Sequence, residues 1–130
     1  MAATARTQDT GGARGDAYTC PSAVGVGDVV YMSAANTVDR AFGGVPPTLQ
    51  AIGVVITKPT TTTARVLGDG HSGDIYTGLS FGTIYYLSST TPGKISATPA
   101  SAPGERFQAI GTASSATSLA IGVDRTSVIL

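Results

Sequence analysis

Two stretches of the chain carry the same sequence pattern, and this internal repeat constrains the fold more than any other feature. Gly27–Ser33 (GDVVYMS) and Gly82–Ser88 (GTIYYLS) have Gly, Tyr and Ser at the same offsets. Further along each half, Gln50–Gly53 recurs letter for letter as Gln108–Gly111, after a Pro-containing loop. The recurrence indicates two related modules.

A third pair of segments follows the other two in the same order, because Thr63–Leu67 corresponds to Thr117–Ile121. Chance similarity in a chain rich in Thr, Ala and Gly is the alternative explanation, but three separated motifs in one order favour a duplication. Each copy is too small to bury its own apolar face, so two copies should pack face to face or close into a barrel. We expect the modules at about residues 23–70 and 78–130.

Composition disfavours helices. Ser and Thr make up about a quarter of the residues, with 17 Gly and 7 Pro, whereas the helix formers Leu, Glu and Lys are scarce. β-branched and small residues suit short strands joined by turns. The sequence therefore predicts an all-β protein, a small β-sandwich or barrel built from two pseudo-repeated β-modules over residues 23–130.

The first residues follow a different pattern. Residues 1–19 contain isolated charges and several glycines, with no apolar period of a helix or a strand. We expect residues 1–22 to form an extended N-terminal arm. Its charged and aromatic side chains are candidates for docking, namely Arg6, Arg14, Asp16 and Tyr18.

Charge and hydropathy exclude several functions. The net charge is zero and only 12% of the residues are charged, so no basic surface for nucleic acid is expected. No apolar run approaches the roughly 18 residues of a transmembrane helix, and the start of the chain lacks the apolar core of a signal peptide. We therefore expect no membrane association and synthesis in the cytoplasm. One cysteine and one histidine predict no disulfide, no metal site and no cofactor.

An enzymatic function lacks the residues it would need. His71 is the only histidine, and it lies in a Gly-rich turn with Ser72, Asp69 and Asp74. Catalytic groups should meet from separate rigid elements, so this turn is interpreted as a solvated linker between the modules. A calcium loop at the two aspartates lacks a closing glutamate, because Glu105 is the only one in the chain. We expect no catalytic residues and no enzyme.

The remaining functional signal is an excess of apolar residues. Val29–Met32 and Ile84–Leu87 are apolar on both faces, and the chain is apolar through Leu130. A partner subunit would cover such strands, and a sandwich that buries all of them internally is the alternative. The candidates for a subunit interface are Tyr31, Tyr86, Val128, Ile129 and Leu130.

The motifs resemble those of tailed-phage virion proteins. Gly78–Ser88, Thr91–Ile95 and Gln108–Ala113 are similar to a β-module of these proteins, although the usual proline is absent from Leu79–Gly82. The first module, Gly27 through Val66, resembles the repeat of small head-decoration proteins. Together the two resemblances cover about 100 residues of the chain.

The resemblance implies a capsid decoration, or cement, protein. Such a protein binds the outer surface of the head as a homotrimer and stabilises it against the pressure of packaged DNA; its partners are the major capsid protein and itself. It would be made in the host cytoplasm and located on the virion, with the arm reaching over a capsid subunit. The alternative is a tail-fibre or tail-tip module that binds a receptor or glycan, with Tyr31, Tyr76, Tyr85 and Tyr86 as stacking surfaces. The short chain favours decoration.

Overall fold

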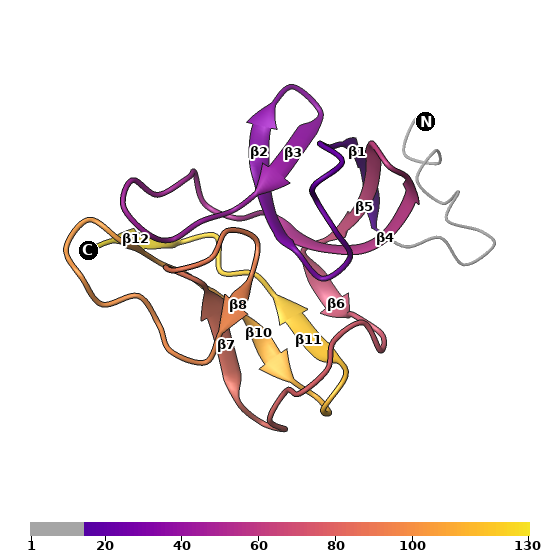
Figure 1. Ribbon diagram of the computed structural model, residues 1–130. Coiled ribbons are helices and arrows are strands. Elements are labelled where there is room, and N and C mark those ends of the chain that lie inside the picture. Colours follow the sequence, from indigo (N-terminus) through magenta and orange to yellow (C-terminus); the bar gives the residue numbers. More distant parts are fainter. Residues whose placement is uncertain (1–14) are drawn as a thin grey trace, which may run out of the picture.

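The computed structural model describes residues 15–130, and these residues form strands and no helix (Figure 1). The all-β prediction is confirmed. The strands are β1 Asp16–Thr19, β2 Val29–Ala34, β3 Thr37–Arg40, β4 Gly53–Thr60, β5 Thr63–Leu67, β6 Asp69–His71, β7 Ile84–Leu87, β8 Ile95–Ser96, β9 Arg106–Phe107, β10 Ala109–Ala113, β11 Leu119–Gly122 and β12 Val128–Ile129. None of the described residues lies in a helix that could cross a membrane.

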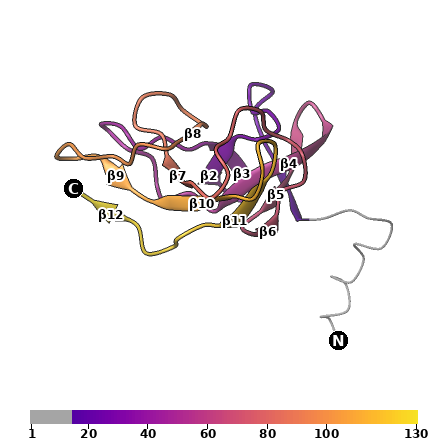
Figure 2. The same cartoon turned by 90° about the horizontal axis from the view of Figure 1, so that it is seen from below.

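The first five strands close into a barrel in the order β1-β3-β2-β4-β5. The second half forms a five-stranded sheet in the order β6-β11-β10-β7-β8, and β9 pairs with β12 in a separate two-stranded ribbon. The chain passes from the barrel to the second sheet through Gly68, which joins β5 directly to β6. The ribbon lies at one end of the body, and β4 and β5 lie toward the other (Figures 1 and 2).

Strands β2 and β4 are apolar on both faces because each face meets a different core. Val30 and Val55 belong to the barrel core, whose buried members are Cys20, Val24, Val30, Val38, Val55, Ala64 and Val66. Their neighbours Val29 and Val54 face a second core shared with the sheet of β7, β10 and β11, which includes Leu87, Ile110 and Leu119. Alternate residues of a strand point to opposite faces, so one strand serves both cores. The apolar excess of Val29–Met32 is thus largely covered within the subunit.

The repeated motifs take corresponding places in the two sheets. Strand β2 pairs with β4 through Val30↔Gly53, and β7 pairs with β10 through Tyr85↔Gly111. These are the same positions of the repeat. The order β2-β4-β5 in the barrel matches β7-β10-β11 in the sheet. A duplication would produce this correspondence.

The third motif matches one residue away from the expected register. Val54 pairs with Leu67, whereas Thr112, at the position of Val54 in the repeat, pairs with Ala120. Leu67 therefore corresponds to Ala120, and buried Val66 corresponds to buried Leu119. The expected match of Thr63–Leu67 to Thr117–Ile121 is corrected by one position.

The expected arm of residues 1–22 is wrong for Asp16–Cys20. Asp16–Thr19 forms β1, which pairs with β5 over its whole length and touches β3 through Thr19↔Thr37. Cys20 follows in the barrel core and donates its backbone N–H to Thr62 O at 2.9 Å. Backbone pairing, not an apolar pattern, places this segment in the barrel. Arg6 and Arg14 lie outside the described residues.

Candidate functional site

The expected docking residues on β1 belong to the barrel wall. Asp16 lies opposite Val66 and Tyr18 lies opposite Ala64 across the β1–β5 pair. Tyr18 is partly buried and packs against the barrel core. Neither residue is on a free arm, so a docking role for them would have to use the outside of the barrel.

The two tyrosines expected at a subunit interface are half-buried in their own subunit. Tyr31 packs against the core between the sheets. The ring of Tyr86 lies 5.3 Å from that of Phe107, centroid to centroid, at an interplanar angle of 51°. Only part of each side chain is available to a partner.

The other three interface candidates are exposed. Val128 is 53% exposed, Ile129 48% and Leu130 43%. Sequence reasoning missed two further apolar side chains beside them, Val45 at 64% and Leu49 at 65%. We call these five residues the apolar end. A signal was present in the sequence, since these two apolar residues flank a Pro-Pro pair in a loop.

Backbone contacts bring the two parts of the apolar end together. Gly104 donates its N–H to Leu130 O at 2.6 Å, and a Cβ on Gly104 would lie 3.3 Å from Val45. Leu130 N–H in turn donates to Glu105 O at 2.8 Å. Loop 43–49, loop 101–105 and β12 therefore meet at one end of the body (Figure 1).

Arg106 holds this end in place. Its Nε donates to Thr48 O at 3.0 Å and its guanidinium NH1 donates to Ser127 Oγ at 2.6 Å, while its backbone N–H donates to Gly43 O at 2.9 Å. Ser127 Oγ donates to Gln50 Oε1 at 3.2 Å. The surface is thus held before any partner binds, which reduces the entropic cost of binding.

The His71 cluster is arranged differently from a catalytic site. Gly73 N–H donates to His71 Nδ1 at 3.1 Å, so the proton of the neutral ring lies on Nε2, which is 3.2 Å from Ser114 Oγ. The imidazole therefore donates to the serine, whereas a general base must accept the serine proton. Asp69, expected in a linker turn, lies instead in β6, which pairs with β11. No group of metal-ligating side chains occurs among residues 15–130.

Two of the tyrosines considered for ligand stacking are engaged inside the subunit. Tyr76 OH donates to Gly27 O at 3.0 Å, and Tyr85 OH accepts from Ser80 N–H at 3.0 Å. Tyr85 is only 8% exposed. The Tyr85 ring is therefore not offered to a glycan, and Tyr76 is partly buried with its hydroxyl bonded inward.

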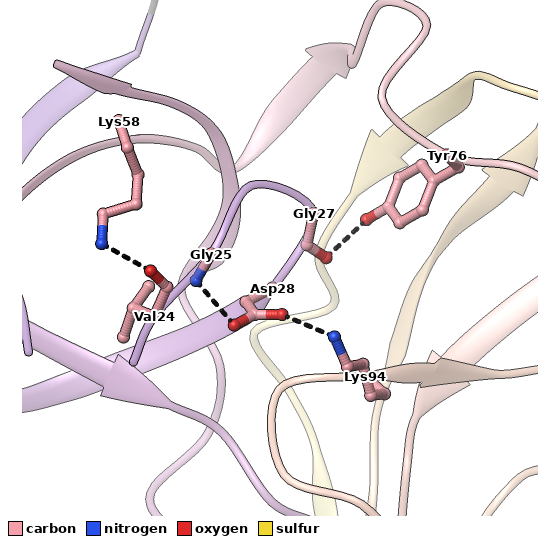
Figure 3. Close-up of polar contacts among 7 residues, drawn as sticks. All are labelled: Val24, Gly25, Gly27, Asp28, Lys58, Tyr76 and Lys94. Carbon is pink, nitrogen blue, oxygen red and sulfur yellow. Dashed lines mark hydrogen bonds and ion pairs between the residues drawn. The ribbon is translucent and has the colours of Figure 1, made fainter. Parts of the chain in front are cut away.

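A buried carboxylate joins the two halves near Tyr76 (Figure 3). Asp28 accepts from Gly25 N–H at 2.9 Å and from Lys94 Nζ at 3.1 Å. Burial of the Tyr76 hydroxyl, and secondly the Asp28 carboxylate, raises the pKa of Tyr76 far above its ordinary value of 10.0. Nearby, Lys58 Nζ donates to Val24 O at 2.5 Å and to Thr61 O at 2.9 Å. These contacts stabilise the body.

The polar groups of the interior are satisfied. No buried side-chain nitrogen or oxygen within residues 15–130 is without a hydrogen-bond partner. The described interior therefore offers no orphaned polar group that points to a bound molecule, and the apolar end is its strongest candidate for function. The chain matches no known family model, no curated protein and no solved structure.

Proposed function

We propose that the protein is a structural protein of tailed-phage virions, a decoration protein that binds the outer surface of the head as a trimer. The apolar end carries this proposal. Five large apolar side chains are exposed in segments that meet at this end and are tied together by Arg106, and exposed apolar side chains gathered at one end of a small body favour a protein–protein contact. The major capsid protein and further copies of the chain are the proposed partners.

The sequence motifs supply the phage context. Gly27–Ser33 and Gly82–Ser88, which resemble head-decoration and virion modules, contain the central strands β2 and β7. In this proposal the repeated strands build a rigid body, and its surfaces make many weak contacts across the head. Many weak contacts made together hold a shell more firmly than any one of them.

Quantitative labelling of purified virions tests the proposal. Hundreds of copies on the head are expected for a decoration protein. A handful or a few dozen copies confined to the tail would favour the alternative, a tail-tip module. Absence of the protein from virions would overturn both.

A binding assay tests the role of the apolar end. Leu49→Ser should weaken attachment to isolated heads at least tenfold because it removes exposed apolar area without entering the core. Phe81→Ser is the matched control, since Phe81 is 82% exposed and is not part of the apolar end. Equal binding by the two variants would contradict this role.

A further inference from the structure

Within residues 15–130, β12 pairs only with β9, and no described strand pairs with its outer edge. In the β9–β12 ribbon, Leu130 N–H donates to Glu105 O, and Ile129 lies opposite Arg106. Arg106 N–H points away from β12, to Gly43 O. The pair Ile129–Arg106 is therefore a non-hydrogen-bonded pair, and Ile129 likewise points its N–H and C=O away from β9.

Ser127 immediately precedes β12, which is Val128–Ile129, and continuing the same alternation by one residue pair would turn its backbone groups to the same edge. With Ser127 extended in this way, Ser127 and Ile129 together would present two N–H donors and two C=O acceptors to the outside. The Ser127 side chain is bonded inward, to Arg106 and Gln50. An extended strand fits this edge.

The edge of β12 is short, at two residues, and it lacks the other common kinds of protection. Exposed edge strands commonly carry lysine, proline or a bulge that blocks further pairing. Residues 126–130 contain no lysine and no proline, and β12 has no register shift against β9. A two-stranded ribbon is also marginal in water and gains stability from further strands.

We propose that β12 pairs antiparallel with β12 of a second copy of the chain, across a twofold axis at Val128. Ser127 of each copy then lies opposite Ile129 of the other, and each such pair exchanges two backbone hydrogen bonds. Val128 faces Val128 of the second copy in a non-hydrogen-bonded pair. The result is one continuous sheet in the order β9-β12-β12-β9.

Side-chain charge permits a second copy as the occupant, and the self-complementary edge favours it. Residues 126–130 carry no ionised side chain, so two copies of the edge do not repel one another. In this register the donors of one edge meet the acceptors of the other, so the edge is complementary to itself, as a twofold contact requires. The inference goes beyond the proposed function and needs no head. It is also compatible with trimers, because an icosahedral shell places neighbouring threefold positions across twofold axes.

Disulfide trapping tests the register. In Val128→Cys the two new thiols lie on a non-hydrogen-bonded pair, with Cα atoms about 4.5 Å apart, which a disulfide can span. Ile129→Cys places the thiol opposite Ser127, with its own copy about 7–8 Å away diagonally and out of reach. With oxidised glutathione, V128C should form covalent dimers at least tenfold faster than I129C. The native chain is the negative control and should form no covalent dimer, because its one cysteine, Cys20, is buried.

Two results would overturn the proposal. One is equal dimer formation by V128C and I129C, and the other is equal dimer formation by V128C and Phe81→Cys. Phe81 lies far from β12, at the end of β10 where Gly82 N–H donates to Ala113 O. A noncovalent test accompanies them. Val128→Lys places like charges opposite one another and should weaken self-association in sedimentation at least tenfold, while Phe81→Lys should not. Unchanged association of V128K would contradict the twofold contact whatever the outcome of head binding.

Discussion

The side-chain amide of Gln108 is hydrogen-bonded to both backbone groups of Ala51. Its Oε1 accepts from Ala51 N–H at 2.8 Å and its Nε2 donates to Ala51 O at 3.0 Å. The same Nε2 donates to Asp124 O at 2.8 Å. Gln108 is 1% exposed, so one amide joins the barrel, the second sheet and the segment leading to β12 where water cannot replace it.

Gln108→Ala should lower the free energy of unfolding by about 2–4 kcal/mol, because it leaves buried backbone groups without partners. Gln50→Ala is the matched control. Gln50 is the equivalent glutamine of the first module, but it is half-buried and accepts one bond, from Ser127. Its loss should be under about 1 kcal/mol. Urea denaturation measures both, and equal losses would show that the Ala51 bridge does not stabilise the body.

The ion pair of Asp28 and Lys94 should be worth more than an ordinary surface pair. The Asp28 side chain is 5% exposed and that of Lys94 is 61% exposed. Lys94→Met leaves a buried carboxylate with Gly25 N–H as its remaining partner, at an expected loss of about 1–3 kcal/mol.

Arg125→Met removes one exposed positive charge elsewhere and should change the stability by less than about 0.5 kcal/mol. In an Asp28→Asn background the effect of Lys94→Met should shrink, because no buried charge is left unpaired. Undiminished loss in that background would mean that Lys94 acts through packing alone.

The repeated glycines Gly53 and Gly111 should not tolerate a side chain. A Cβ on Gly111 would lie 2.5 Å from Ala120 O, and one on Gly53 would lie 2.7 Å from Leu67 O. Alanine at either position should destabilise by about 1–3 kcal/mol through overpacking. Gly122, also in a strand, has nothing within 4 Å of its Cβ position, so Gly122→Ala is the control. Thermal melting of the three variants tests this prediction. An unchanged melting temperature of Gly111→Ala would show that β10 and β11 lie farther apart than the structure gives.

The strand assignments that followed apolar residues were predictable from the sequence. The matched motifs Gly27–Ser33 and Gly82–Ser88 contain β2 and β7. Strand β2 is apolar on both faces because two cores share it, whereas β7 contributes to one core and leaves Ile84 48% exposed on its other face. The predicted match of the third motif was wrong by one residue because it rested on residue identity alone and not on which residues are buried. Serine hydroxyls of the turn before β11 bond one another, and this turn has no counterpart in the letters of the first module.

Polar strands could not be found in the same way. All three residues of β6 are exposed, as are three of the four in β1, so neither carries an apolar alternation. Their places come from backbone pairing with β11 and β5, which local patterns do not reveal. The Gln108 bridge was likewise hidden, since the sequence shows two equivalent glutamines and only the tertiary structure separates their roles.

Stability should fall in alkaline solution because of Tyr76. Its pKa is raised in the folded state, so the unfolded state loses the tyrosine proton first, near the ordinary value of 10.0. The stabilisation is present below that pH and is lost as the pH rises above it. Tyr76→Phe should lower stability at neutral pH by about 1 kcal/mol, through the lost bond to Gly27, and flatten the alkaline decline. Urea denaturation over this pH range tests both, and parallel curves for the two proteins would contradict the assignment.

Removal of residues 1–19 should open the barrel, because it deletes β1. Asp16–Thr19 pairs with β5 along its length, and Tyr18 covers part of the barrel core. The expected fall in melting temperature is about 10 °C or more.

Removal of residues 1–14 is the control, since it leaves every contact of β1 with β5 in place. In the decoration proposal this shorter truncation should keep the melting temperature and weaken attachment to heads, because Arg6 and Arg14 are lost from the proposed docking arm. Full attachment by the shorter truncation would assign docking to the body, and an unchanged melting temperature after removal of residues 1–19 would show that β1 does not hold the barrel closed.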